Sequence, residues 1–117
     1  MASQSQQAEA VLNHHLQAFS MGLEELMKDY TDSSVIIGPD GPVRGISGVR
    51  KFFQGLLTSL PADFIPKLAI TRREVHNDVA YIAWTALPYC PLGTDTFVVR
   101  SGKIAVQTFA FYIPKGK

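Results

Sequence analysis

The amino-acid sequence predicts an α+β protein in which helices cover one face of a curved antiparallel sheet. Apolar residues recur at helical spacing in the first half of the chain. The second half contains four long segments rich in Val, Ile, Thr and aromatic residues, with short turns between them. Helices that precede an antiparallel meander favour two layers, one of helices and one of strands.

Two helices are expected first, from about residue 6 to 21 and from about 23 to 31. Leu12, Leu16 and Phe19 recur at i, i+4 and i+7 in the first of them. Gly22 separates the two helices, because glycine takes the left-handed conformation that ends a helix at little cost. Residues 1–5 are expected to be frayed.

The period then changes. Residues 35–37 are expected to form a short buried strand, residues 38–42 a turn rich in Gly and Pro, and residues 43–45 a strand stub. A third helix is expected at about 47–60, with its buried face formed by Val49, Phe52, Phe53, Leu56 and Leu57. Pro61 ends it.

Four strands are expected to follow, at about 64–76, 79–87, 94–100 and 103–113. Asn77-Asp78 and Ser101-Gly102 stand where tight hairpin turns are needed. Residues 88–91 form a longer loop between the second and third of these strands.

Composition limits the function classes. A length of 117 residues predicts one domain over 1–117, and 46% apolar with 18% charged residues excludes a disordered chain. A net charge of +1 provides no surface for nucleic acid or an anionic membrane. The polar N-terminus and the lack of a long apolar run favour a cytoplasmic protein. Cys90 is the only cysteine and the three histidines are scattered, so neither a metal nor another cofactor is expected.

Three segments carry a resemblance to a known family. Residues 22–35 (GLEELMKDYTDSSV), 42–53 (PVRGISGVRKFF) and 93–104 (GTDTFVVRSGKI) resemble, in order and spacing, three parts of the nuclear transport factor 2-like superfamily, and within it the SnoaL-like and ketosteroid-isomerase-like proteins. With the order of elements, the resemblance covers about residues 8–113. It implies a cone in which the sheet and the helices enclose one apolar pocket. Members include isomerases, cyclases, dehydratases, hydrolases and non-catalytic binding modules, so the resemblance leaves the reaction open.

Asp95 is the first candidate for a catalytic residue. It lies in a strand otherwise made of Thr, Phe and Val, where a carboxylate is out of place. It shares one strand face with Phe97 and Val99. In ketosteroid isomerases the aspartate of the matching Asp-x-Phe stays protonated and donates to the oxyanion of the substrate. The alternative is a strand-end aspartate that accepts hydrogen bonds from backbone amides.

His15 is the second candidate. It shares the apolar face of the first helix with Leu12, Leu16 and Phe19. The resemblance places it near the pocket tyrosine of the ketosteroid isomerases, where a histidine could act as a donor or a base. The alternative is a core histidine with satisfied hydrogen bonds.

The sequence departs from the family at Gly38, which stands where the isomerases carry their catalytic aspartate. This departure disfavours the steroid-isomerase route and leaves His15 as the base, with Asp95 or Tyr30 as its partner. The remaining predicted ligand-binding residues form apolar walls: Tyr30, Phe53, Trp84, Phe97, Phe19 and Met27.

These observations predict a protein that binds a small apolar molecule. The first hypothesis is an acid–base enzyme of the isomerase, cyclase or dehydratase type that acts on an apolar carbonyl or ring compound. The alternatives are a non-catalytic domain that binds a hydrophobic ligand and a dimeric interaction domain.

The last hairpin predicts a homodimer. A tight turn at Ser101-Gly102 would pair Arg100 with Lys103, Val98 with Ala105 and Thr96 with Gln107. The outer sheet face would then show Val98, Ala105, Phe109 and Phe111, an apolar patch too large for a monomer to expose. A two-fold dimer through this face is therefore expected. The alternative is a bulge near Gln107, which would swap some of these faces.

Overall fold

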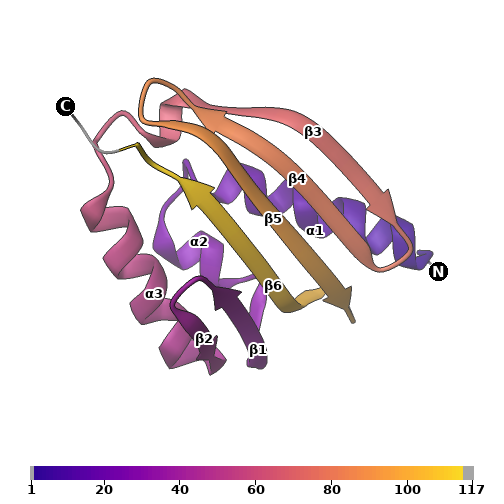
Figure 1. The fold of residues 1–117 in the computed structure, drawn as a ribbon. Helices are drawn as coiled ribbons and strands as arrows, with labels where there is room; N and C mark the ends of the chain where they lie inside the picture. Colours follow the sequence, from indigo (N-terminus) through magenta and orange to yellow (C-terminus); the bar gives the residue numbers. More distant parts are fainter. Residues whose placement is uncertain (1, 115–117) are drawn as a thin grey trace.

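The computed structural model describes residues 2–114 and has the predicted α+β architecture. Three helices and a short 3₁₀ helix accompany six strands (Figure 1): α1 (Gln4–Ala18), α2 (Leu23–Met27), β1 (Tyr30–Gly38), β2 (Gly41–Arg44), α3 (Gly45–Ser59), η1 (Ile65–Lys67), β3 (Leu68–His76), β4 (Val79–Ala86), β5 (Cys90–Arg100) and β6 (Lys103–Tyr112). The strands follow the order β2-β1-β6-β5-β4-β3 in one curved sheet. The sheet is mixed, because β1 runs parallel to β6 and the other neighbours are antiparallel.

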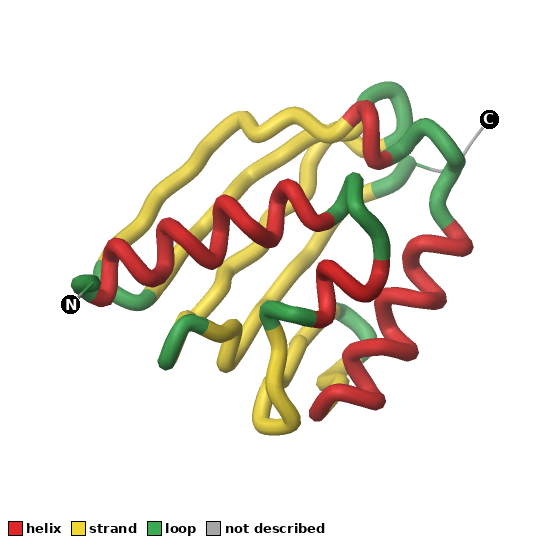
Figure 2. Tube along the Cα trace, turned by 180° about the vertical axis from the view of Figure 1, so that it is seen from behind, coloured by secondary structure: helices red, strands yellow, loops and turns green. Residues whose placement is uncertain are grey.

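The helices cover one face of this sheet (Figure 2). Helix α1 contacts β3, β4 and β5, and α3 contacts β1 and β2. The space between the two layers holds the core, in which Leu12, Leu26, Ile36, Phe53 and Ile104 are almost wholly buried. Within residues 2–114 the helices are too short or too polar to cross a membrane.

Several predicted boundaries were wrong, among them the start of β5, which begins at Cys90 inside the predicted loop 88–91 and not at residue 94. Helix α1 starts at Gln4 because Ser3 and Gln6 form a reciprocal capping box, so most of the segment expected to be frayed is ordered, and Met1 lies outside the described residues. Tyr30 begins β1 and does not end a helix, since the neighbouring Ile104 amide of β6 donates to the Asp29 carbonyl. Strand β3 begins at Leu68, after a 3₁₀ turn that contains Pro66.

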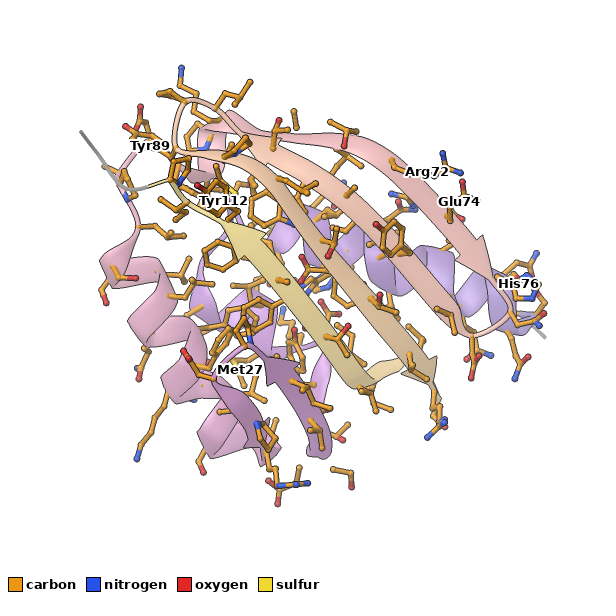
Figure 3. The ribbon with its side chains drawn as sticks, in the orientation of Figure 1. Met27, Arg72, Glu74, His76, Tyr89 and Tyr112 are labelled. Carbon is orange, nitrogen blue, oxygen red and sulfur yellow. The ribbon has the colours of Figure 1, made fainter. Side chains whose placement is uncertain are left out.

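The edge strand β3 carries charged residues on both of its faces. Arg72 and Glu74 form an exposed ion pair on the outer face (Figure 3). Arg73 points the other way and donates to Glu9 and Asn13 of α1. Charges on an edge strand discourage pairing with another sheet edge.

A β-bulge in β6 corrects the predicted faces of the last hairpin. Arg100 pairs with Lys103 as predicted, but Val98 pairs with Val106, so Ala105 is left as an extra residue. One extra residue turns the remainder of the strand over. The side chains of Gln107, Phe109 and Phe111 therefore line the pocket on the inner face, and the large outer apolar patch predicted for the dimer is absent.

Candidate functional site

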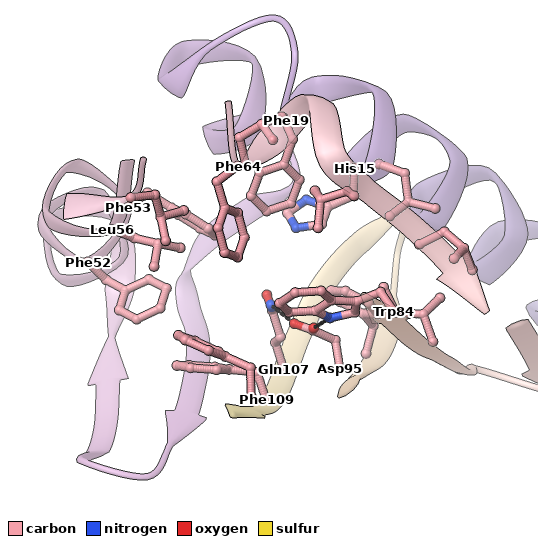
Figure 4. A pocket seen from close by; sticks show the side chains of 18 residues that line it. His15, Phe19, Phe52, Phe53, Leu56, Phe64, Trp84, Asp95, Gln107 and Phe109 are labelled. Carbon is pink, nitrogen blue, oxygen red and sulfur yellow. Dashed lines mark hydrogen bonds between the residues drawn. The ribbon is translucent and has the colours of Figure 1, made fainter. Parts of the chain in front are cut away.

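An apolar pocket lies between the inner sheet face and the helices α1 and α3 (Figure 4). The cavity volume is about 70 Å³, below the roughly 300–1,000 Å³ of typical small-molecule sites, so a bound ring compound would extend into the open mouth of the pocket. Eight of its eighteen lining residues are Phe or Trp, and His15, Asp95 and Gln107 are its polar members. Two of these groups are ionisable and come from opposite layers.

The structure places four of the six predicted wall residues in this lining: Phe19, Phe53, Trp84 and Phe97. Tyr30 and Met27 are buried but do not line the pocket. Both come from the junction of α2 and β1, where the chain turns into the sheet and packs into the core. Phe109 and Phe111 take part in the wall instead, because of the bulge in β6.

Asp95 lies on the inner face of β5 and accepts two hydrogen bonds. The Trp84 indole Nε1 donates to Oδ1 at 2.9 Å, and the Gln107 Nε2 donates to Oδ2 at 2.9 Å. Burial raises the pKa of the Asp95 carboxyl, while the hydrogen bonds from Trp84 and Gln107 act in the opposite direction. Asp95 is therefore a carboxyl group that holds its proton to higher pH than an exposed aspartate.

His15 faces Asp95 and Gln107 across the cavity (Figure 4) and is 0% exposed. Its Nδ1 lies 3.1 Å from Asp29 Oδ2, and its Nε2 lies 3.4 Å from the Tyr30 hydroxyl oxygen. The Tyr30 hydroxyl donates in turn to Gln107 Oε1. Burial, with the charges of Asp95 and Asp29, raises the pKa of Tyr30 well above its usual value, so this hydroxyl keeps its proton.

A charged cluster supports His15 from the solvent side. His14 Nδ1 lies 2.7 Å from Asp29 Oδ1, and His14 Nε2 lies 2.7 Å from Glu25 Oε2. The hydrogen bond to Glu25 has the largest effect and raises the pKa of His14; burial opposes it, and the hydrogen bond to Asp29 with the charges of both carboxylates raises this pKa further. Because both ring nitrogens face carboxylates, His14 is held as the imidazolium.

Asp95 and His15 were predicted from the sequence, whereas Gln107 and Asp29 were not. Gln107 is a polar residue among apolar residues of β6, which could have marked it as a candidate. Without the bulge, however, the predicted register places Gln107 on the outer face of the sheet. Asp29 lies within the second predicted helix, at about 23–31, where a single polar residue gives no sign of a site. The spacing between Asp29 and His15 gave no sign that they meet.

Two glycines make room for aromatic walls. A Cβ at Gly93 would lie 2.2 Å from Trp84 Cζ2, and one at Gly38 would lie 2.5 Å from Phe109 Cζ. The space that a side chain at position 38 would need is therefore filled by the ring of Phe109. The described residues, 2–114, contain no cluster of three or more His, Cys, Asp or Glu side chains that could hold a metal ion.

Comparison with known proteins supports the fold. No protein-family model matches the chain, and no curated protein sequence matches it. Among solved structures, a candidate ketosteroid isomerase from Kribbella flavida superimposes with a TM-score of 0.73 at 17% identity, over 98% of this chain and 87% of that one. An NTF2-like protein of unknown function from Burkholderia xenovorans gives 0.73 at 16% identity, over 95% and 87%. A SnoaL-like protein of unknown function from Burkholderia thailandensis gives 0.70 at 16% identity, over 91% and 94%. At such low identity the likeness concerns the fold and not the reaction. The chain thus has the fold of the nuclear transport factor 2-like superfamily, shared with ketosteroid-isomerase-like and SnoaL-like proteins.

Proposed function

We propose that the pocket binds a neutral apolar ring compound with a carbonyl or hydroxyl group and transfers protons on it. One observation carries the proposal. Asp95 and His15 line the same pocket, which is otherwise apolar apart from Gln107. Two ionisable groups with a cavity between them are the minimum that acid–base catalysis needs.

Each group has a role in this proposal. Asp95, whose pKa is raised by burial, donates a hydrogen bond or a proton to the oxygen of the ligand. The Nε2 of His15 takes a proton from the carbon next to the carbonyl group. His15 then returns its proton to a different carbon of the ligand, and the ligand oxygen returns its proton to Asp95. These two transfers complete an isomerisation, and both residues recover their starting states.

The charge of the lining favours a neutral ligand. No Lys or Arg lines the pocket among the described residues, and Asp95 is its only acidic group. A carboxylate or phosphate in this space would meet an aspartate and aromatic rings without a cation to pair with. The aromatic side chains suit a flat, apolar ring.

Calorimetric titration with 2-naphthol and 2-naphthoate tests the binding part, because the two probes share a ring system and differ in charge. We expect the phenol to bind and the carboxylate to bind at least about tenfold more weakly. Asp95→Asn should weaken binding of the phenol about tenfold, while Asp40→Asn in the exposed turn serves as a matched control. Equal affinity for the two probes would contradict the proposal.

Exchange of the α-hydrogens of 2-tetralone with deuterated water tests the catalytic part. We expect the wild-type protein to accelerate the exchange and His15→Gln to lower the rate by about 10²–10⁴-fold. A non-catalytic binding domain is the second candidate, favoured by Gly38, which offers no carboxylate. Binding of the phenol without acceleration of exchange would select this second candidate.

The homodimer remains part of the proposal, with a revised surface. The residues on the outer face of β4, β5 and β6 include half-buried Tyr81, Ala83, Val98 and Val106. They form a smaller apolar strip than the predicted one, and a second copy would cover it. Light scattering should give twice the chain mass of 12.9 kDa, and Val98→Lys should reduce it to the monomer value. A monomer mass for the wild type would exclude the dimer.

A further inference from the structure

A continuous chain of hydrogen bonds crosses the pocket wall from Asp95 to Asp29. Gln107 Nε2 donates to Asp95, the Tyr30 hydroxyl donates to Gln107 Oε1, and His15 bridges Tyr30 and Asp29. A carboxylate only accepts hydrogen bonds, so the Asp29 end requires a proton on His15 Nδ1. The direction of each remaining hydrogen bond then depends on whether Gln107 turns Nε2 or Oε1 toward Asp95.

The arrangement in the structure suits an ionised Asp95. The carboxylate accepts from Gln107 Nε2, which turns Gln107 Oε1 toward Tyr30. The Tyr30 hydroxyl donates its single proton to that oxygen, so it can only accept a hydrogen bond from His15. His15 Nε2, 3.4 Å away, completes the chain when it carries a proton. An ionised Asp95 therefore goes with a protonated His15.

A protonated Asp95 reverses the chain. A proton on Oδ2 needs an acceptor, which the Gln107 amide supplies when it turns over and exchanges Oε1 for Nε2. Gln107 then donates to Tyr30, whose hydroxyl turns to His15. The Nε2 of His15 can accept this hydrogen bond only when it carries no proton. A neutral Asp95 therefore goes with a neutral His15.

We propose that Gln107 is a positioning residue whose amide couples the proton on Asp95 to the proton on His15 Nε2. The inference rests on the proposed function, and it explains how acid and base become ready together. In the neutral state Asp95 carries the proton to be donated and His15 the free lone pair. When Asp95 gives its proton to the ligand oxygen and His15 takes one from carbon, the pair reaches the other complementary state, and no buried group is left unpaired.

The groups that face the two ends are few. His15 meets Tyr30 and Asp29 at the start of β1, and its neighbour His14 on α1 binds the same Asp29. Asp95 meets Trp84 of β4 and Gln107 of β6. From α3 the ring of Phe53 packs against His15. Asp29 and His14 lie beyond His15, so Gln107 and Tyr30 form the hydrogen-bonded route between Asp95 and His15.

Asp95→Asn gives a direct test, because its side-chain NH₂ mimics the protonated acid. Nitrogen-15 spectra of the histidine rings report whether His15 Nε2 carries a proton, and they need no ligand. With both proteins at the same pH near neutrality, we expect Nε2 to carry a proton in a larger share of wild-type molecules than of Asp95→Asn molecules, because only an ionised Asp95 orients Gln107 and Tyr30 to accept from that proton. In the Gln107→Met background, Asp95→Asn should leave His15 Nε2 unchanged.

Tyr30→Phe breaks the same route at the next link and should have the same effect as Gln107→Met, so the test survives if one of these variants does not fold. The inference is overturned if His15 Nε2 is the same in the wild type and Asp95→Asn. It is also overturned if the effect of Asp95→Asn persists in both backgrounds, which would indicate coupling through space. The proposed function has a separate test. If it is wrong, 2-naphthol does not bind, although Asp95→Asn still changes the proton on His15 Nε2.

Discussion

Ionisation of Asp95 lowers the stability of the folded protein. Its carboxyl is half-buried in a pocket lined by aromatic side chains, and this burial raises its pKa above the unfolded value of about 3.9. The folded protein thus binds this proton more tightly than the unfolded chain does. The contribution of Asp95 to stability is most favourable below about pH 3.9 and is lost as the pH rises through the raised folded pKa.

Asp95→Asn should therefore stabilise the protein at neutral pH while it weakens ligand binding. We expect a gain of about 1 kcal/mol in unfolding free energy near pH 7, since the buried charge is removed and the Gln107 amide can turn to accept from the new NH₂. Thermal unfolding of both proteins across pH measures it. The gain should disappear in acid, and a less stable variant at pH 7 would contradict this account of Asp95.

His14 contributes stability in a different pH window. Its pKa is raised by its two carboxylate partners, Glu25 first and then Asp29. Its contribution is fully present below about pH 6.5, the unfolded value, and is lost as the pH rises through the folded pKa. The difference in melting temperature between wild type and His14→Gln should be largest below that pH and shrink above it. A difference that stays constant from acid to alkaline pH would rule this out.

The sequence predicted the residues that are out of place in their own element. Asp95 is a carboxylate in an apolar strand and His15 a histidine on an apolar helix face, and both line the pocket. Asp29 and Gln107 could not be found in this way. Their roles depend on where α2 ends and on one extra residue in β6, and neither leaves a periodic signal.

Strands β4 and β5 pack closely at Gly93, which leaves room for a large side chain on β4. Trp84 and Gly93 are directly opposite, and the indole lies over the glycine, where it can donate to Asp95. A methyl group at position 93 would occupy the space of the ring. The position of Trp84 is thus set by a residue on the neighbouring strand.

Gly93→Ala should displace the indole and destabilise the protein by about 1–3 kcal/mol. Urea unfolding measures the loss, and the fluorescence of Trp84, the single tryptophan, reports its new environment. Gly55→Ala is the matched control, because a Cβ there meets nothing within 4 Å on α3 and should stabilise the helix by up to about 1 kcal/mol. If both variants behave alike, Gly93 does not position the ring.

Strand β6 shows where prediction from sequence stops at this scale. The order of helices and strands followed from hydrophobic periodicity, and the turn at Ser101-Gly102 was correctly placed. The bulge at Ala105 was not specified by any local pattern, yet it decides that Gln107, Phe109 and Phe111 face the pocket. Register within a strand depends on contacts across the whole sheet.

At the scale of the whole molecule, the fold provides a pocket with its polar groups on opposite walls. The sheet contributes Asp95 and Gln107, and α1 contributes His15. The element order and the resemblance at residues 22–35, 42–53 and 93–104 were sufficient to predict the α+β fold, and the solved structures confirm that fold. We propose that a ring compound lies between these walls with its oxygen at Asp95.

The most direct test follows the side-chain N–H signals of the nitrogen-15-labelled protein during addition of 2-naphthol. Trp84 Nε1–H and Gln107 Nε2–H both donate to Asp95, so they report on this corner of the pocket. We predict that these two signals shift together and saturate, and that Asp95→Asn weakens the response about tenfold. Saturable shifts confined to the outer sheet face, with Trp84 and Gln107 unchanged, would contradict the account.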